Sequence, residues 1–190
     1  PAVVSFHFGL PPRDRIDTLK GAGIKLFTTA TSLEEAMRIE AAGIDVIVAQ
    51  GIEAGGHRGI FDPSAPDPAL PTFELLEQLR SKVSLPLVAA GGIMTGAHIR
   101  TALYHGANAV QMGSAFIACP ESAATPHHRA LIAQGAGLQT ELTAVISGRP
   151  ARGIVNKLFT EVGAEGHPPL PDYPITYDAA KAPVSYTHLT

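Results

Sequence analysis

Cysteine and tryptophan are scarce in this sequence: its 190 residues include one cysteine, Cys119, and no tryptophan. A single cysteine excludes an internal disulfide and suits a reducing compartment, so we expect a cytoplasmic protein. No apolar stretch reaches the length that crosses a bilayer, and the first residues do not read as a secretory signal. The sequence therefore predicts no membrane role.

Basic charge is also limited, with 14 Lys and Arg against 17 Asp and Glu and a net charge of −3. The basic residues form no cluster, so a nucleic-acid partner has no electrostatic support. Metal-ligand spacing is missing too: His127 and His128 are adjacent in an expected helix and point in different directions. We expect no metal.

Alternating strand and helix patterns fill the first 119 residues, and 45% of the whole chain is hydrophobic. Short loops between such elements are typical of a parallel α/β fold. Strands are expected at 2–8, 24–28, 45–49, 85–90 and 107–112. Helices are expected at 13–20, 72–82 and 96–105, and another between a capping box at 32–35 and Gly43.

The pattern changes after residue 119. We expect a helix at 120–134, a strand-like run at 141–146, a basic turn at 148–153 and a short helix at 156–161. Residues 120–182 therefore form a partly helical, partly irregular appendage in this interpretation. Residues 183–190 are an unassigned tail.

A glycine-rich loop follows the expected strand at 45–49 and ends in a histidine. Four glycines lie between residues 51 and 59, and two of them, Gly55 and Gly56, directly precede His57. Glycine lets the backbone approach a ligand closely. Parallel α/β folds keep their chemistry at such loops, so His57 is a candidate catalytic residue rather than an ordinary surface histidine.

Two further strands also end in small residues, at Gly91-Gly92 and at Gly113-Ser114. Two adjacent turns of this kind direct backbone N–H groups and a hydroxyl at one anion. In TIM (β/α)8 barrels the loops after strands seven and eight bind phosphate in this way. Counting back gives only strands four to eight, too few to close a barrel. We therefore expect a C-terminal fragment of a TIM barrel over residues 1–119.

Three motifs together resemble the FMN-dependent nitronate monooxygenases, formerly called 2-nitropropane dioxygenases. They are residues 49–59 (AQGIEAGGHRG), 86–93 (PLVAAGGI) and 106–114 (GANAVQMGS). The resemblance extends over about residues 1–182. It implies a TIM barrel with a helical part, and an enzyme that oxidises alkyl nitronates with dioxygen to a carbonyl compound and nitrite.

The resemblance also implies roles for residues in these motifs. His57 matches the base that removes the α-proton of a neutral nitroalkane, a task that suits an imidazole. The expected FMN-binding residues are Gln50, Gly55, Gly56, Gly91, Gly92, Gln111, Met112, Gly113 and Ser114.

Other functions remain open at this point. Flavin-dependent enoyl reductases and NAD(P)H:quinone reductases resemble the chain at the same motifs and use a nicotinamide in place of dioxygen. Arg58 and the proline-rich stretch at 61–71 favour the nitronate enzymes. An inactive barrel fragment is a further alternative, and a homo-oligomer is a possible assembly.

Overall fold

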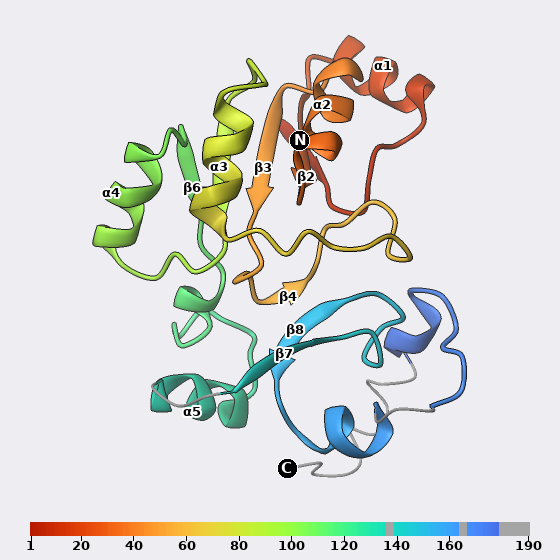
Figure 1. Cartoon of the computed structure of the whole chain (residues 1–190), viewed down its shortest axis with the longest axis vertical. Helices are drawn as coiled ribbons and strands as arrows, with labels where there is room; N and C mark the ends of the chain where they lie inside the picture. Colours follow the sequence, from red (N-terminus) through yellow and green to blue (C-terminus); the bar gives the residue numbers. More distant parts are fainter. Residues whose placement is uncertain (136–138, 164–166, 179–190) are drawn as a thin grey trace. The chain divides into compact units, whose positions relative to one another are not determined.

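The computed structural model describes residues 1–135, 139–163 and 167–178 (Figure 1). It divides into two compact units. The first holds residues 1–54 and 59–115, and the second holds residues 55–58 and the described residues from 116 onward. The tail expected at 183–190 lies outside the described residues, as do residues 179–182 of the expected appendage.

The first unit is built on a five-stranded parallel sheet with the order β1-β2-β3-β5-β6. Its strands are β1 (Val3–Phe6), β2 (Lys25–Ala30), β3 (Val46–Gln50), β5 (Leu87–Ala90) and β6 (Ala109–Gln111). Neighbouring strands follow one another along this unit's sheet, as the alternating pattern predicts. All five expected strands are confirmed, each within a few residues of its expected bounds.

Four helices connect these strands: α1 (Arg13–Gly21), α2 (Leu33–Ala41), α3 (Thr72–Arg80) and α4 (Gly96–Tyr104). Helix α2 packs on β2, α3 on β3 and β5, and α4 on β6. Within the described ranges, no helix is both long and apolar enough to cross a membrane.

The core of this unit lies between the helices and one face of the sheet. Leu26, Ile47 and Leu87 from three neighbouring strands are buried in one cluster with the helical residues Ile39 and Leu76. Side chains alternate between the faces of a strand. Val48, Gln50 and Ala90 therefore point to the opposite face, and they are buried as well. Burial on both faces is typical of a parallel α/β sheet.

The capping box expected at the start of α2 is confirmed in one half only. The Ser32 side chain accepts a hydrogen bond from the Glu35 N–H, at 3.2 Å. The Glu35 carboxylate, however, accepts from the N–H groups of Thr31, at 2.6 Å, and Phe61, at 2.7 Å, instead of closing the box on Ser32. It thereby fastens the start of the proline-rich stretch to the helix.

The second unit contains an antiparallel sheet with the order β4-β8-β7. Its strands are β4 (Gly56–His57), β7 (Thr140–Thr143) and β8 (Ala151–Ile154), and its helical segments include α5 (Pro126–Gln134) and a π-helical turn at Leu158–Val162. The basic turn predicted at 148–153 is wrong from Ala151 onward. Pairing with the nearby β7 and with the distant β4 makes this segment a strand, and the local sequence does not reveal the second of these pairings. The predicted helix at 120–134 begins only at Pro126, capped by the Thr125 side chain.

Candidate functional site

Three strands of the first unit end side by side at the carboxyl edge of its sheet. Gln50 of β3 pairs with Ala90 of β5, and Ala90 pairs with Gln111 of β6. The loops that leave this edge are the glycine loops singled out in the sequence. Because β5 and β6 pair, the Gly91-Gly92 and Gly113-Ser114 turns leave this edge from adjacent strands.

The glycines in these turns are needed for their backbone shape. Gly91 and Gly92 have φ angles of 119° and 65°, a region that side chains other than glycine's rarely adopt. Gly113 is exposed, and a Cβ atom added to it would meet open space among the described residues. Exposed backbone on two neighbouring turns, with the Ser114 hydroxyl beside it, fits a phosphate group.

Thr72, which the sequence reasoning missed, ties two of these loops together. It opens helix α3, and its side chain is buried. Its N–H and hydroxyl lie 3.0 and 2.9 Å from Glu53 Oε2, and the hydroxyl lies 3.1 Å from the Gly91 carbonyl. A Cβ atom on Gly51 would lie 2.0 Å from the Thr72 hydroxyl, so glycine is required for this approach. Its position after Pro71 at a helix start was the only signal in the sequence.

Gln50, expected to contact a flavin, has a structural contact. Its side chain is buried, and Oε1 accepts a hydrogen bond of 2.8 Å from the Gly59 N–H. This bond joins Gln50, where the glycine loop begins, to Gly59, where it ends, and both residues belong to the first unit. Gln111 is exposed, and Met112 and Ser114 are half-buried.

His57 is held within the second unit. It lies on β4 opposite Ala151 of β8. Its Nε2 atom is 2.8 Å from the hydroxyl oxygen of Ser147, a fully buried residue. The rings of Tyr173 and Tyr177 meet the imidazole edge-on, with centroids 5.5 and 5.8 Å away. An imidazole that is anchored at Nε2 and packed against two aromatic rings has a defined orientation, which a proton-transfer group needs.

Neither tyrosine was singled out in the sequence, and a glycine explains how one of them reaches the histidine. Gly148 has a φ angle of 81°, and a Cβ atom there would lie 2.5 Å from the Pro171 carbonyl oxygen. The absence of a side chain lets the chain at 171–173 pass against this turn. Tyr173 then reaches His57. The other glycines of the motif, Gly55 and Gly56, are exposed at the start of β4.

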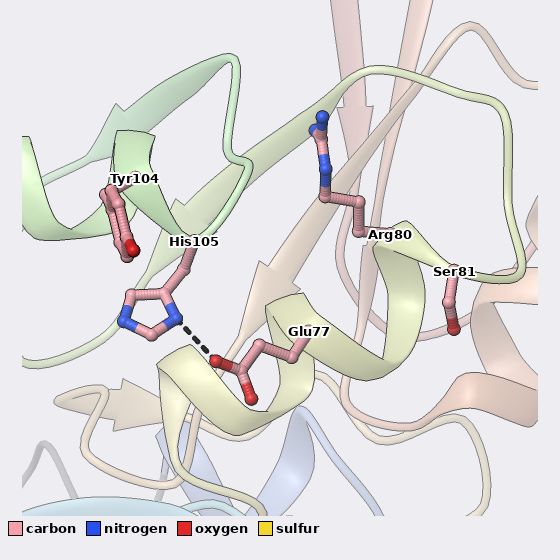
Figure 2. Close-up of a pocket in the computed structure, with 5 residues that line it drawn as sticks. All are labelled: Glu77, Arg80, Ser81, Tyr104 and His105. Carbon is pink, nitrogen blue, oxygen red and sulfur yellow. Dashed lines mark hydrogen bonds and ion pairs between the residues drawn. The ribbon is translucent and has the colours of Figure 1, made fainter.

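A separate hollow of about 400 Å³ in the first unit lies between the C-terminal ends of α3 and α4 (Figure 2). His105 Nδ1 lies 2.8 Å from Glu77 Oε1, and the His105 ring stacks on Phe73. In parallel β/α folds these helix ends lie at the edge opposite the catalytic one, where residues serve stability. The contacts of His105 are therefore structural. In the described part of the chain, no group of three acidic, histidine or cysteine residues is arranged to hold a metal.

The geometry defines a fold class. The first unit is a parallel β/α sheet of TIM-barrel type with glycine turns at the carboxyl ends of adjacent strands, the edge at which enzymes of this fold place their active sites.

Comparisons with known proteins narrow the class to a family. The nitronate monooxygenase family model matches residues 1–184. Nitronate monooxygenases of Pseudomonas aeruginosa and Paraburkholderia phytofirmans share 54% and 55% sequence identity with this chain, in each case over 96% of its length. The chain belongs to the nitronate monooxygenase family, whose members are flavin-dependent oxidoreductases. It spans about half the length of these curated relatives, 52% and 50%.

Solved structures agree with this assignment. A nitroalkane oxidase from Streptomyces ansochromogenes matches with a TM-score of 0.85 and 43% identity, and the match covers 95% of this chain and 54% of the oxidase chain. FabK from Thermotoga maritima matches with a TM-score of 0.69 and 32% identity, and the match covers 84% of this chain and 50% of the FabK chain. The TIM-barrel type of fold expected from the sequence is confirmed.

Proposed function

We propose that this chain is part of an FMN-dependent enzyme that oxidises alkyl nitronates, such as propionate 3-nitronate, with dioxygen. The products are a carbonyl compound and nitrite. The observation that carries the proposal is the anchored imidazole of His57 in a chain of the nitronate monooxygenase family. The single cysteine supports a cytoplasmic location.

The residues at the carboxyl edge of the sheet suit FMN. The backbone of two adjacent glycine turns is a ready acceptor of its phosphate. The residues proposed to hold the cofactor are Gln50, Gly55, Gly56, Gly91, Gly92, Gln111, Met112, Gly113 and Ser114. FMN, when bound, supplies the one-electron chemistry between nitronate and dioxygen that no side chain provides.

His57 acts on the substrate in this proposal. A neutral nitroalkane must lose its α-proton before it can be oxidised, and the His57 imidazole takes that proton. An anionic nitronate has already lost the proton, so His57 only positions it. The histidine is therefore needed more for neutral nitroalkanes than for nitronates.

Aerobic turnover of the flavin-loaded full-length protein tests this function. Nitrite release and oxygen consumption are measured with nitroethane and with propionate 3-nitronate, for the wild type and for His57→Asn. We expect His57→Asn to lower kcat/KM for nitroethane by about 100-fold or more, the usual contribution of a general base. Turnover of the nitronate should fall much less.

The matched control is His105→Asn, which removes a histidine from the structural pair with Glu77. Both activities should be unchanged in this variant. A wild-type protein that releases no nitrite from either substrate would overturn the proposed function. Equal losses on the two substrates in His57→Asn would overturn the role of His57 as a base.

A further inference from the structure

The hydrogen bonds of Ser147 bear on which nitrogen of His57 carries a hydrogen. Ser147 lies in a turn closed by bonds of 3.1 and 2.7 Å from its own N–H and that of Gly148 to the Ala144 carbonyl. It is fully buried, so water does not compete for its hydroxyl. Besides His57 Nε2 at 2.8 Å, the hydroxyl oxygen has two close partners, the carbonyl of Arg149 at 3.0 Å and the N–H of Arg149 at 3.3 Å.

A hydroxyl group has one proton to donate and two lone pairs to accept with. The Arg149 carbonyl can only accept, so the Ser147 proton is directed to it. The Arg149 N–H can only donate, so it occupies one lone pair. The second lone pair faces His57, and a favourable contact there requires Nε2 to carry a hydrogen.

We propose that Ser147 is a positioning residue that fixes the tautomer and orientation of His57. In a neutral imidazole with its hydrogen on Nε2, the basic lone pair lies on Nδ1. Nδ1 is then the atom that takes the substrate proton, an assignment that rests on the proposed function. The edge-on rings of Tyr173 and Tyr177 restrict rotation of the imidazole about this anchor.

The tautomer can be measured without any turnover. The flavin-loaded full-length protein is labelled with ¹⁵N-histidine, and His57 is assigned by the signal that His57→Asn removes. Long-range ¹H–¹⁵N correlation distinguishes the two tautomers. We expect the wild type to show hydrogen on Nε2, and Ser147→Ala to show a mixture of both forms. A wild type with hydrogen on Nδ1 would overturn the proposal, because Nε2 would then accept the Ser147 proton.

Kinetics provide the second readout. Ser147→Ala should lower kcat for nitroethane by about 10-fold, the lower end of the losses found when a partner that orients a metal-bound histidine is removed. Its turnover of propionate 3-nitronate should stay close to wild type. Ser147→Thr keeps the hydroxyl and should restore both the tautomer and part of the lost rate.

The matched control is Thr143→Val, which removes a hydroxyl from the same segment, where it accepts from the Val145 N–H. This variant should leave the tautomer and both rates unchanged. If Ser147→Ala binds flavin normally yet keeps the wild-type tautomer and rates, the proposal is wrong. If the wild type turns over neither substrate while the tautomer responds as expected, the proposed function fails and the positioning role stands.

Discussion

Thr72→Val should destabilise the first unit and weaken the proposed binding of FMN. Valine matches threonine closely in shape and in helix propensity, so the change removes the hydroxyl and little else. That hydroxyl is buried and shares its single proton between two acceptors, the Glu53 carboxylate at 2.9 Å and the Gly91 carbonyl at 3.1 Å. Its loss leaves the loops after β3 and β5 without their shared tether.

The size of the effect follows from these contacts. A hydrogen bond to a charged group contributes about 1.5–3 kcal/mol, and we expect the lower part of this range because Glu53 is exposed. Thr72→Val should therefore lower the free energy of unfolding by about 1–2 kcal/mol. If about 1 kcal/mol of this loss comes from the Gly91-Gly92 turn becoming less ordered, the Kd for FMN rises about 5-fold.

Urea unfolding of the full-length protein measures the free energy of unfolding, and flavin fluorescence on dilution measures the Kd for FMN. Thr101→Val is the matched control. Its hydroxyl, on the exposed side of α4, donates to the Ala97 carbonyl at 3.1 Å, so its loss should change stability by less than about 0.5 kcal/mol. A double-mutant cycle of Thr72→Val with Glu53→Ala should give a coupling energy of about 1 kcal/mol. Full additivity would refute the tether.

Three other changes test separate parts of the structure. Gly113→Ala adds a methyl group in open space among the described residues, so stability should be unchanged while FMN affinity, measured by fluorescence, falls. Ser32→Ala removes the cap bonded to the Glu35 N–H and should cost about 1 kcal/mol in urea unfolding; no loss would contradict the cap. Burial acts to raise the pKa of Asp45, but the Leu26 N–H and two neighbouring lysines hold this pKa below its ordinary value. The stabilisation by Asp45 is therefore complete above the unfolded pKa of about 4 and is lost as the pH falls through the folded pKa. The difference in unfolding free energy between the wild type and Asp45→Asn should shrink below about pH 4, and a constant difference would contradict it.

The parallel half of the fold could be predicted from the sequence because its signals are local. Buried apolar runs, glycines after them and a cap at Ser32 each act within a few residues. The same is true of the glycine turns, whose positive φ angles at Gly91 and Gly92 permit few other residues.

The second unit could not be predicted in this way. Strand β8 pairs with the nearby β7 and also with Gly56 and His57 of the glycine loop, which lie more than 90 residues earlier in the sequence. The contacts of His57 with Ser147, Tyr173 and Tyr177 span 90 or more residues, so no spacing rule reveals them. Thr72 was missed for the same reason, because its partners lie 19 residues away in two different loops.

In the proposed reaction the flavin takes its electrons from the nitronate and not from a nicotinamide. The most direct test is anaerobic mixing of the flavin-loaded full-length protein with propionate 3-nitronate and, separately, with NADH, followed by flavin absorbance. We expect the nitronate to bleach the flavin and NADH to leave it oxidised. Bleaching by NADH alone would contradict the proposed function and would make the protein a nicotinamide-dependent reductase.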